Sequence, residues 1–332
     1  MTGGRSSSPT SPKGEGETTI VEPADSSPSP TPSSARQAYL ELAGLPDVIL
    51  PGTLLGRYVV LEVVGRGGMG TVVRAYDPRL RREVAVKRLR PRASPEQAEA
   101  RLVREARAMA QLNHPNVVAV YDVEAVPWGV LVAMEYVRGP TLREWLREPR
   151  SRREILEAFR QAGAGLAAAH AAGLVHRDFK PANVLMEESP DSRGVGRVRV
   201  TDFGLARGIH AGEPAVSLDS GEDALDAVDP SGDELTAAGL VLGTPVYMAP
   251  EQHAGETAGP AADQYAFCVA LWEALAGARP FEAEDHEALA RAKAQGPPPW
   301  PRPREVPARI SQAIRRGLAP DPGERFPTMA EL

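Results

Sequence analysis

The chain has 332 residues, 42% of them hydrophobic, which is enough for one large two-lobed domain or two ordinary ones. Its net charge of -6 at pH 7 argues against a nucleic-acid partner. The single cysteine, Cys268, excludes a disulfide framework and a cysteine-based zinc site. No apolar run approaches the ~20 residues of a membrane span, and the N-terminus lacks the apolar core of a signal peptide. We therefore expect a cytoplasmic protein, with membrane attachment only if the native chain continues beyond Leu332.

The N-terminal tail, residues 1–50, is rich in Ser and Pro. Its first part carries few large apolar side chains, so it cannot bury enough surface to offset the entropy of ordering, and we predict that it is disordered. A short helix is expected over residues 34–45, leading into the folded domain.

A Val-rich pattern then predicts a small sheet lobe over residues 51–137. One helix is expected within it, over residues 94–112, because Ser94 is a good N-cap and Pro95 suits the first helical position. The expected strands cover residues 54–65, 70–77, 82–90, 116–125 and 129–137.

The remaining residues, 138–332, predict a larger and mainly helical lobe, with helices at 141–148, 152–173 and 261–277. An acidic insertion at residues 207–236 interrupts it and is interpreted as a mobile spacer. Near the end, Thr328 resembles an N-cap. This pattern predicts a helix that begins there and is truncated, so the sequence is interpreted as the front part of a longer protein.

Residues 65–70 read GRGGMG, a GxGxxG pattern that is weak evidence when taken alone. A dinucleotide-binding fingerprint leads from a strand into a helix, whereas here a second strand, TVVRAYD, follows the glycines. The expected structure is a hairpin whose tip folds over phosphates with its backbone N–H groups pointing inward. A Gly-rich hairpin without a ligand fits these six residues equally well.

Lys87 ends the predicted strand VAVK among apolar neighbours. Taken alone, it favours a solvated strand end. Eighteen residues later, Glu105 lies on the predicted helix. If the two side chains pair inside a cleft, the carboxylate would hold the ammonium toward the α- and β-phosphates of a nucleotide.

The stretch HRDFKPAN, residues 176–183, crowds polar side chains into one short turn. Asp178 can accept a hydrogen bond from a substrate hydroxyl, and Lys180 can neutralise a phosphoryl group in transfer. Asn183 offers an amide oxygen to a hard cation, and Asp202 in the following DFG would complete an oxygen site for Mg²⁺. His176 is interpreted as a packing and hydrogen-bonding residue rather than a base.

Together these motifs resemble those of the eukaryotic-like (Hanks-type) bacterial serine/threonine protein kinases. The resemblance extends from about residue 56 to the end of the chain. It implies a bilobal protein-kinase fold of the α+β class, with a small antiparallel-sheet N-lobe and a larger helical C-lobe. It also implies transfer of the ATP γ-phosphoryl group to Ser or Thr hydroxyls, with Mg²⁺, in bacterial signalling. The motifs are GxGxxGxV at residues 65–72, VAVK ending at Lys87, HRDxKxxN at 176–183, DFG at 202–204 and GTPVYMAPE ending at Glu251.

The resemblance further implies the site residues. Asp263 would brace the catalytic loop, and Glu251 would form a buried ion pair with Arg325. The implied catalytic residues are Asp178, Lys180, Lys87, Glu105, Asn183 and Thr244; the implied ATP-binding residues are Val64, Gly65, Arg66, Gly67, Gly68, Met69, Gly70, Val72, Ala85, Lys87, Glu135, Val137 and Leu185; the implied metal ligands are Asn183 and Asp202.

Regulation is expected to act through the activation loop, because Arg177 is typical of kinases that hold a phosphorylated loop residue. Thr236 is the first candidate for autophosphorylation, with Ser217, Ser220 and Ser231 as competitors. A homodimer for autophosphorylation in trans is a further expectation.

Two other functions use a related fold. A pseudokinase scaffold would lack Lys87, Asp178 or Asp202, and all three are present. A small-molecule kinase would keep the catalytic aspartate but lack GTPVYMAPE, the segment that docks a protein substrate. The expected partners are therefore proteins that carry Ser or Thr.

Overall fold

The computed structural model describes residues 49–67, 70–89, 95–126, 129–187, 195–203, 245–301 and 306–332. These residues belong to one unit, Asp47–Leu332. The predicted tail, the helix expected at 34–45 and the acidic insertion lie outside the described residues, apart from the last residues of the tail. Within the described part of the chain, no helix combines the length and the apolar character needed to cross a membrane.

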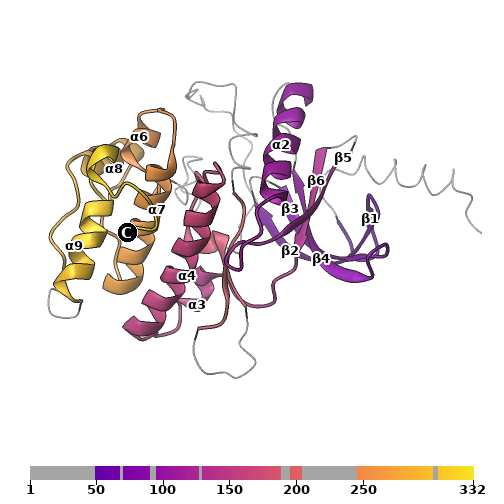
Figure 1. Cartoon of the computed structure of the whole chain (residues 1–332), viewed down its shortest axis with the longest axis horizontal. Helices are drawn as coiled ribbons and strands as arrows, with labels where there is room; N and C mark the ends of the chain where they lie inside the picture. The colour runs from indigo at the N-terminus through magenta and orange to yellow at the C-terminus, as the bar shows by residue number, and fades with distance from the viewer. Residues whose placement is uncertain are drawn as a thin grey trace, which may run out of the picture. The chain divides into compact units, whose positions relative to one another are not determined.

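A six-stranded antiparallel sheet forms the first lobe of this unit (Figure 1). The strand order is β1-β2-β3-β4-β6-β5, and helix α2 (Pro95–Ala110) packs against β5. The strands are β1 Leu54–Leu55, β2 Tyr58–Gly67, β3 Gly70–Asp77, β4 Arg82–Leu89, β5 Val120–Val126 and β6 Gly129–Glu135.

The predicted elements of this lobe are confirmed, with several bounds that shift by one to four residues and one strand that is divided. The first predicted strand is divided into β1 and β2, with a turn at Gly56 and Arg57. The strand predicted from residue 116 begins at Val120, because the preceding residues bond to the other lobe: Val118 N–H donates to the carbonyl of Val200 at 2.9 Å.

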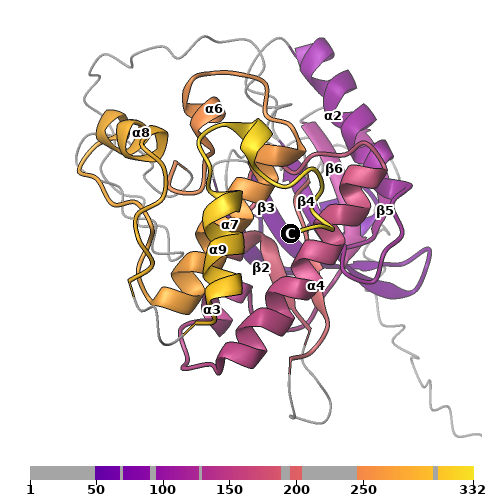
Figure 2. The ribbon, with the colours of Figure 1, turned by 60° about the vertical axis from the view of Figure 1, so that its left-hand side comes forward.

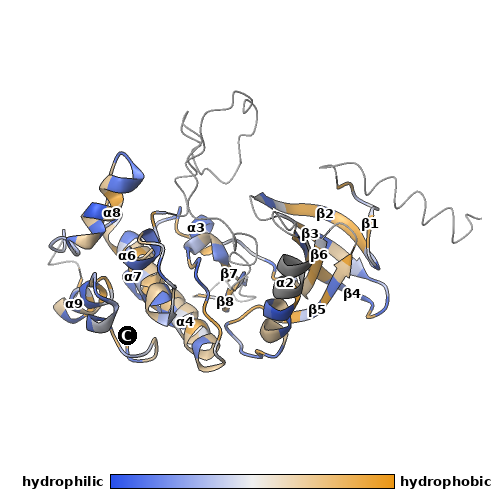
Figure 3. Cartoon of the chain, turned by 90° about the horizontal axis from the view of Figure 1, so that it is seen from above, coloured by the Kyte–Doolittle hydropathy of each residue, from blue (hydrophilic) through white to orange (hydrophobic). Residues whose placement is uncertain are grey.

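Alternation along the strands divides the apolar side chains between two cores. Val84 and Val86 of β4 belong to a core confined to the sheet lobe, whereas Ala85 and Leu89 belong to a core that continues into the second lobe. Lys87 shares the face of Ala85 and Leu89, so the strand period directs it toward the second lobe. Figure 3 shows hydrophobic residues along the strands of the sheet.

The second lobe is mainly helical, as predicted (Figure 2). Helix α7 is apolar on most of its surface and lies in the core, in contact with α4 and α9. The helices are α3 Leu142–Trp145, α4 Arg152–Ala171, α6 Pro250–His253, α7 Pro260–Ala276, α8 His286–Ala294 and α9 Ala308–Gly317; a two-stranded antiparallel sheet pairs β7 Val184–Met186 with β8 Val198–Val200.

Local capping explains where two of these helices begin. Thr141 and Ser151 each accept a hydrogen bond from the backbone of a glutamate three residues later, and Glu144 and Glu154 return the contact. Thr328, by contrast, starts a turn: its hydroxyl contacts Glu331 Oε1 at 3.1 Å, and no helix is assigned among residues 327–332. The helix predicted to begin there stays a prediction.

Candidate active site

The loop at residues 174–183, hereafter the catalytic loop because it carries the predicted catalytic residues, joins α4 to β7, and one carboxylate of α7 supports it. Asp263, 1% exposed in α7, accepts backbone N–H bonds from His176 at 2.7 Å and from Arg177 at 2.6 Å. It also contacts His170 Nε2 at 2.8 Å. A buried carboxylate that accepts several hydrogen bonds fixes the backbone that supplies them. The predicted bracing role of Asp263 is therefore confirmed.

His176 is fully buried and uses both of its ring nitrogens. Nε2 lies 2.8 Å from the carbonyl oxygen of Thr201, and Nδ1 accepts the N–H of Asp178 at 3.3 Å. Its ring lies against Phe203, with centroids 4.7 Å apart. This geometry leaves no ring nitrogen for a substrate proton, which confirms that His176 is a packing residue.

Asp178, Lys180 and Asn183 converge at the end of the loop. Lys180 Nζ lies 3.3 Å from Asp178 Oδ2, and Asn183 Nδ2 donates to the same oxygen at 3.2 Å and to the Asp178 carbonyl at 2.8 Å. The carbonyl of Asn183 in turn accepts from Thr201 N–H at 3.0 Å, which brings Asp202 beside the loop. The structure thus gathers four predicted site residues from two segments.

Lys87 reaches this cluster from β4, where its Nζ lies 2.8 Å from Asp202 Oδ2. Burial would raise the pKa of Asp202, but the Lys87 ammonium outweighs burial and holds that pKa below its usual value. The predicted pair of Lys87 with Glu105 stays a prediction. The contact seen at Glu105 is with Arg177, at 3.9 Å between Oε1 and Nη1.

Two residues of the site adopt backbone conformations that side chains rarely occupy. Arg177 has a φ of 66° and Asp202 a φ of 67°. Non-glycine residues in the left-handed region cost of order 1–3 kcal/mol and concentrate at functional sites. The bonds of Asp263 to the catalytic loop and of Lys87 to Asp202 hold these conformations in place.

Several of the residues predicted to bind ATP lie on neighbouring strands of the sheet. Val72 pairs directly with Lys87 across β3 and β4, and Ala85 is buried two residues earlier on the same face. Leu185 forms an isolated bridge with Thr141 at the start of the second lobe, and Val64 is 54% exposed. Of the predicted residues, Gly68, Met69 and Thr244 lie outside the described residues, as do Gly204 and the four phosphorylation candidates.

The backbone conformation and the surroundings of residue 70 require a glycine, whereas those of residue 65 leave room for a side chain. Gly70 has a φ of 139°, and an added Cβ would lie 2.0 Å from the carbonyl oxygen of Arg88, whereas a Cβ on Gly65 would meet no atom within 4 Å. We expect Gly70→Ala to destabilise the protein by about 1–3 kcal/mol. Gly65→Ala should change stability by less than about 0.5 kcal/mol. Urea unfolding of both variants checks this, and equal midpoints for the two would contradict it.

Sequence reasoning missed two residues that support the site. Arg199 lies between Val198 and Val200 in β8, is 7% exposed, and contacts the carboxylates of Glu135 and Glu187. Gln252 donates from Nε2 to the carbonyl of Arg177 at 3.0 Å, joining α6 to the catalytic loop. A charged residue within the Val-rich strand could have indicated that Arg199 is buried and paired, whereas nothing in the sequence around Gln252 indicated its contact.

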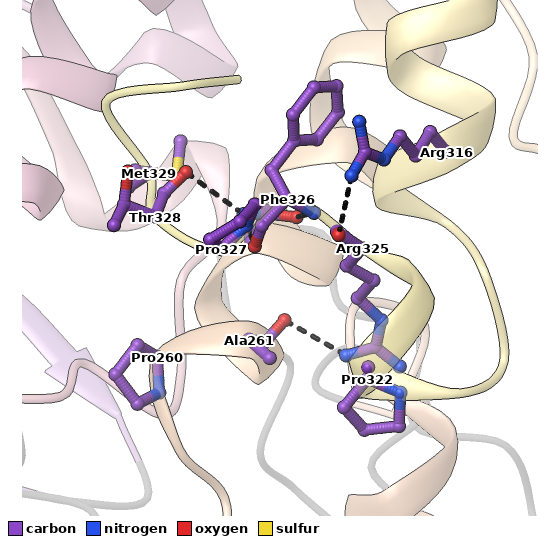
Figure 4. A pocket seen from close by; sticks show the side chains of 11 residues that line it. Pro260, Ala261, Arg316, Pro322, Arg325, Phe326, Pro327, Thr328 and Met329 are labelled. Atoms are coloured by element: carbon purple, nitrogen blue, oxygen red, sulfur yellow. Dashed lines mark hydrogen bonds between the residues drawn. The ribbon is translucent and has the colours of Figure 1, made fainter.

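The segment at residues 245–251 is anchored by the predicted ion pair. Arg325 donates from Nη1 and Nη2 to Glu251 Oε1 and Oε2 at 2.8 and 2.9 Å, and its side chain is fully buried. It also donates to the carbonyls of Ala261, Ala319 and Pro320. A pocket of about 310 Å³ lies beside Arg325 and Phe326 (Figure 4). The predicted ion pair between Glu251 and Arg325 is confirmed.

Comparison with known proteins identifies the family. The protein kinase domain model matches residues 58–332. The chain is 37% identical over 283 residues to the serine/threonine-protein kinase PknA of Mycobacterium tuberculosis, covering 82% of this chain and 59% of that protein. It is 38% identical over 296 residues to the serine/threonine-protein kinase pkn3 of Myxococcus xanthus, covering 86% and 50%. The chain thus spans about half to three-fifths of the length of these relatives.

The fold comparison agrees. The crystal structure of a point mutant of the Mycobacterium tuberculosis PknI kinase domain matches with a TM-score of 0.61 and 26% identity, covering 86% of this chain and 96% of that one. The match extends over most of this chain, so it includes both the antiparallel-sheet lobe and the helical lobe. The chain therefore belongs to the protein kinase family, among the relatives of the bacterial Ser/Thr kinases.

Proposed function

We propose that this chain is an ATP-dependent serine/threonine protein kinase. The observation that carries the proposal is the convergence of two pairs: Lys87 lies 2.8 Å from Asp202, and Asn183 donates to Asp178 at 2.8 and 3.2 Å. The backbone bond from Thr201 N–H to the carbonyl of Asn183, at 3.0 Å, brings the two pairs together. Of the four paired residues, three come from the second lobe and one from the first. A cluster of this kind, at the join of a sheet lobe and a helical lobe, suits phosphoryl transfer, where positioning and charge stabilisation supply most of the catalysis.

The roles follow from the chemistry of each side chain. The Asp178 carboxylate accepts the proton of a Ser or Thr hydroxyl, whose oxygen forms the new bond to the γ-phosphorus while the bond to the ADP oxygen breaks. Lys180, beside Asp178, balances the charge that develops on the phosphoryl oxygens. Lys87 directs its ammonium toward the α- and β-phosphates, held by Asp202 and, as we propose, by Glu105.

The donor set fits a hard divalent cation. Asn183 directs Nδ2 toward Asp178, so its amide oxygen is the atom left for a metal, and Asp202 is kept ionised by Lys87. Two oxygen ligands beside substrate phosphates are typical of Mg²⁺. When bound, the ion would neutralise phosphate charge. Asn183 and Asp202 would hold it, with the adenine on the wall of Val72, Ala85 and Leu185.

Residues 245–251, hereafter the docking segment, support a protein as the substrate. Glu251 and Arg325 anchor one end of this segment to the helical lobe, and Gln252 ties it to the catalytic loop. We assign the N-lobe to residues 51–137 and the C-lobe to 138–332, and we propose autophosphorylation at Thr236 by a second copy of the chain. The alternative, a catalytically weak pseudokinase scaffold, is less consistent with an intact polar cluster.

The test is phosphate transfer by the purified chain. With γ-labelled ATP and Mg²⁺, we expect label on Thr236 or on neighbouring serines, mapped by mass spectrometry. Lys87→Met should remove it, because a thioether cannot contact phosphate or hold Asp202. Arg160→Met, which removes a 67% exposed arginine of α4 that pairs with Glu157 on the same helix, is the matched control and should keep the label. ATP binding without transfer in the wild type would favour the scaffold.

A further inference from the structure

Lys293 is a fully buried lysine that the mechanism above does not use. It lies in α8, and its Nζ donates to the carbonyls of Pro245, Val246 and Met248 at 2.8, 2.9 and 2.7 Å. All three acceptors belong to the docking segment. An ammonium has three N–H groups, so each of them has one carbonyl partner.

In the part of the chain that the structure describes, Lys293 is surrounded by backbone carbonyls and aromatic rings rather than by acids. Among the described residues, no carboxylate forms an ion pair with Lys293, although burying an ammonium is costly unless its charge is compensated. From α6, His253 Nε2 lies 3.2 Å from Nζ, and from α7 the ring of Tyr265 lies 5.9 Å away. His286 of α8 contacts His253, with 3.3 Å between Nε2 and Nδ1. Backbone carbonyls are thus the main compensation.

This arrangement makes the docking segment depend on one side chain. The segment runs from Pro245 to the buried Glu251, and Lys293 holds its first half while Arg325 holds its second half. Helices α6 and α8 are neighbours in the second lobe (Figure 1). A neutral amine has only two N–H groups, so loss of the proton removes one of the three bonds to the segment; the carbonyl of Pro245 also accepts from Met248 N–H at 3.2 Å, whereas those of Val246 and Met248 rely on Lys293 among the described contacts. A buried carbonyl that loses its donor favours movement of the segment.

We propose that Lys293 is a positioning residue for protein-substrate recognition, whose ammonium fixes the docking segment so that loss of its proton weakens peptide binding and leaves ATP binding unchanged. The proposal rests on the proposed kinase function, because peptide recognition is the activity that it tunes. Lys293 contacts neither ATP nor the reacting atoms, and it acts through the backbone of residues 245–248.

Lys293 titrates near neutral pH. Burial lowers the pKa of Lys293 to about 7, and burial, with Lys293 and His286 nearby, lowers the pKa of His253 to about 4. His253 is therefore neutral where Lys293 titrates. In the unfolded chain, the pKa of a lysine is about 10.4. Between the folded pKa of about 7 and this value, Lys293 binds more protons in the unfolded chain than in the folded one. The contribution of Lys293 to the free energy of unfolding therefore rises with pH in this range. Because deprotonation of Lys293 does not favour unfolding in that pH range, a weaker binding of peptide there cannot be attributed to unfolding caused by this residue.

The experiment measures the KM of a Ser/Thr peptide, selected from a peptide array by the wild-type protein, and the KM of ATP from about pH 6 to about pH 9. In the wild type we expect the peptide KM to rise about tenfold around the pKa of Lys293, with a flat ATP KM. In Lys293→Met the peptide KM should be high at every pH. Arg291→Met, an exposed cation on the same helix, is the matched control and should follow the wild type.

Parallel pH profiles in the wild type and Lys293→Met, or a peptide KM and an ATP KM that rise together, would overturn the proposal. If Lys293→Met does not fold, NMR titration of the Lys293 Cε in the wild type replaces it. A pKa that differs from the midpoint of the peptide KM by more than about one unit then refutes the proposal.

A separate measurement keeps this inference distinct from the kinase activity. Absence of any transfer by the wild type would refute the proposed function. Hydrogen exchange of the amides in the docking segment, corrected for intrinsic rates, still tests Lys293. Protection of the segment that falls as Lys293 loses its proton supports the inference, and protection that does not change refutes it.

Discussion

Asp178→Asn is expected to lower the rate of phosphoryl transfer by about 100- to 10,000-fold, the usual contribution of a positioned general base. The amide keeps the shape of the side chain but cannot accept the hydroxyl proton. The backbone contact of Asn183 Nδ2 with the carbonyl of residue 178 does not depend on the side chain, and His176 and Arg177 remain bonded to Asp263. The fold should therefore survive the substitution.

Single-turnover transfer to the selected peptide, with a melting curve of each protein, checks this expectation. Glu287→Gln is the matched control, because it neutralises an 84% exposed carboxylate on α8. We expect Asp178→Asn to bind ATP as the wild type does and to melt at nearly the same temperature. Transfer within about threefold of the wild type would remove Asp178 from the proposed mechanism.

Glu251→Ala is expected to destabilise the protein by about 3–5 kcal/mol, because it leaves a buried guanidinium without its counter-charge. The side chain of Arg325 is fully buried, and its two bonds to Glu251, at 2.8 and 2.9 Å, would both be lost. The remaining carbonyl partners, among them Ala319 at 2.9 Å, cannot neutralise the charge. For a domain of this size the melting temperature should fall by about 10 °C.

Calorimetry of three variants separates the ion pair from simple loss of packing. Replacing both partners, as Glu251→Met with Arg325→Met, should cost less than Glu251→Ala alone, since no buried charge is left unpaired. Glu287→Ala breaks the exposed pair with Arg291 and should cost less than about 1 kcal/mol. A melting temperature of Glu251→Ala equal to that of the wild type would contradict the structural role of this pair.

The sequence by itself predicted the order of the elements and the residues that we propose for the site. Alternation along REVAVKRL places Lys87 on the face of Ala85, and a turn with Pro181 between Asp178 and Asn183 keeps three polar groups within one loop. These are local properties, because the strand period of two and the spacing within a short loop follow from backbone geometry. The same holds for the capping boxes at Thr141 and Ser151.

The tertiary structure decided which charged groups meet across distant segments, apart from Glu251 and Arg325, whose pairing the family resemblance had implied. Lys87 contacts Asp202 and Glu105 contacts Arg177, and both pairs depend on how α2 and the two lobes pack. Lys293 is the clearest case. In sequence it is one basic residue of the polar helix HEALARAKA, while in the fold it is buried against three carbonyls some 45 to 48 residues away. Sequence patterns specify the face of a helix, but the burial of a charge depends on the neighbours that the whole fold supplies.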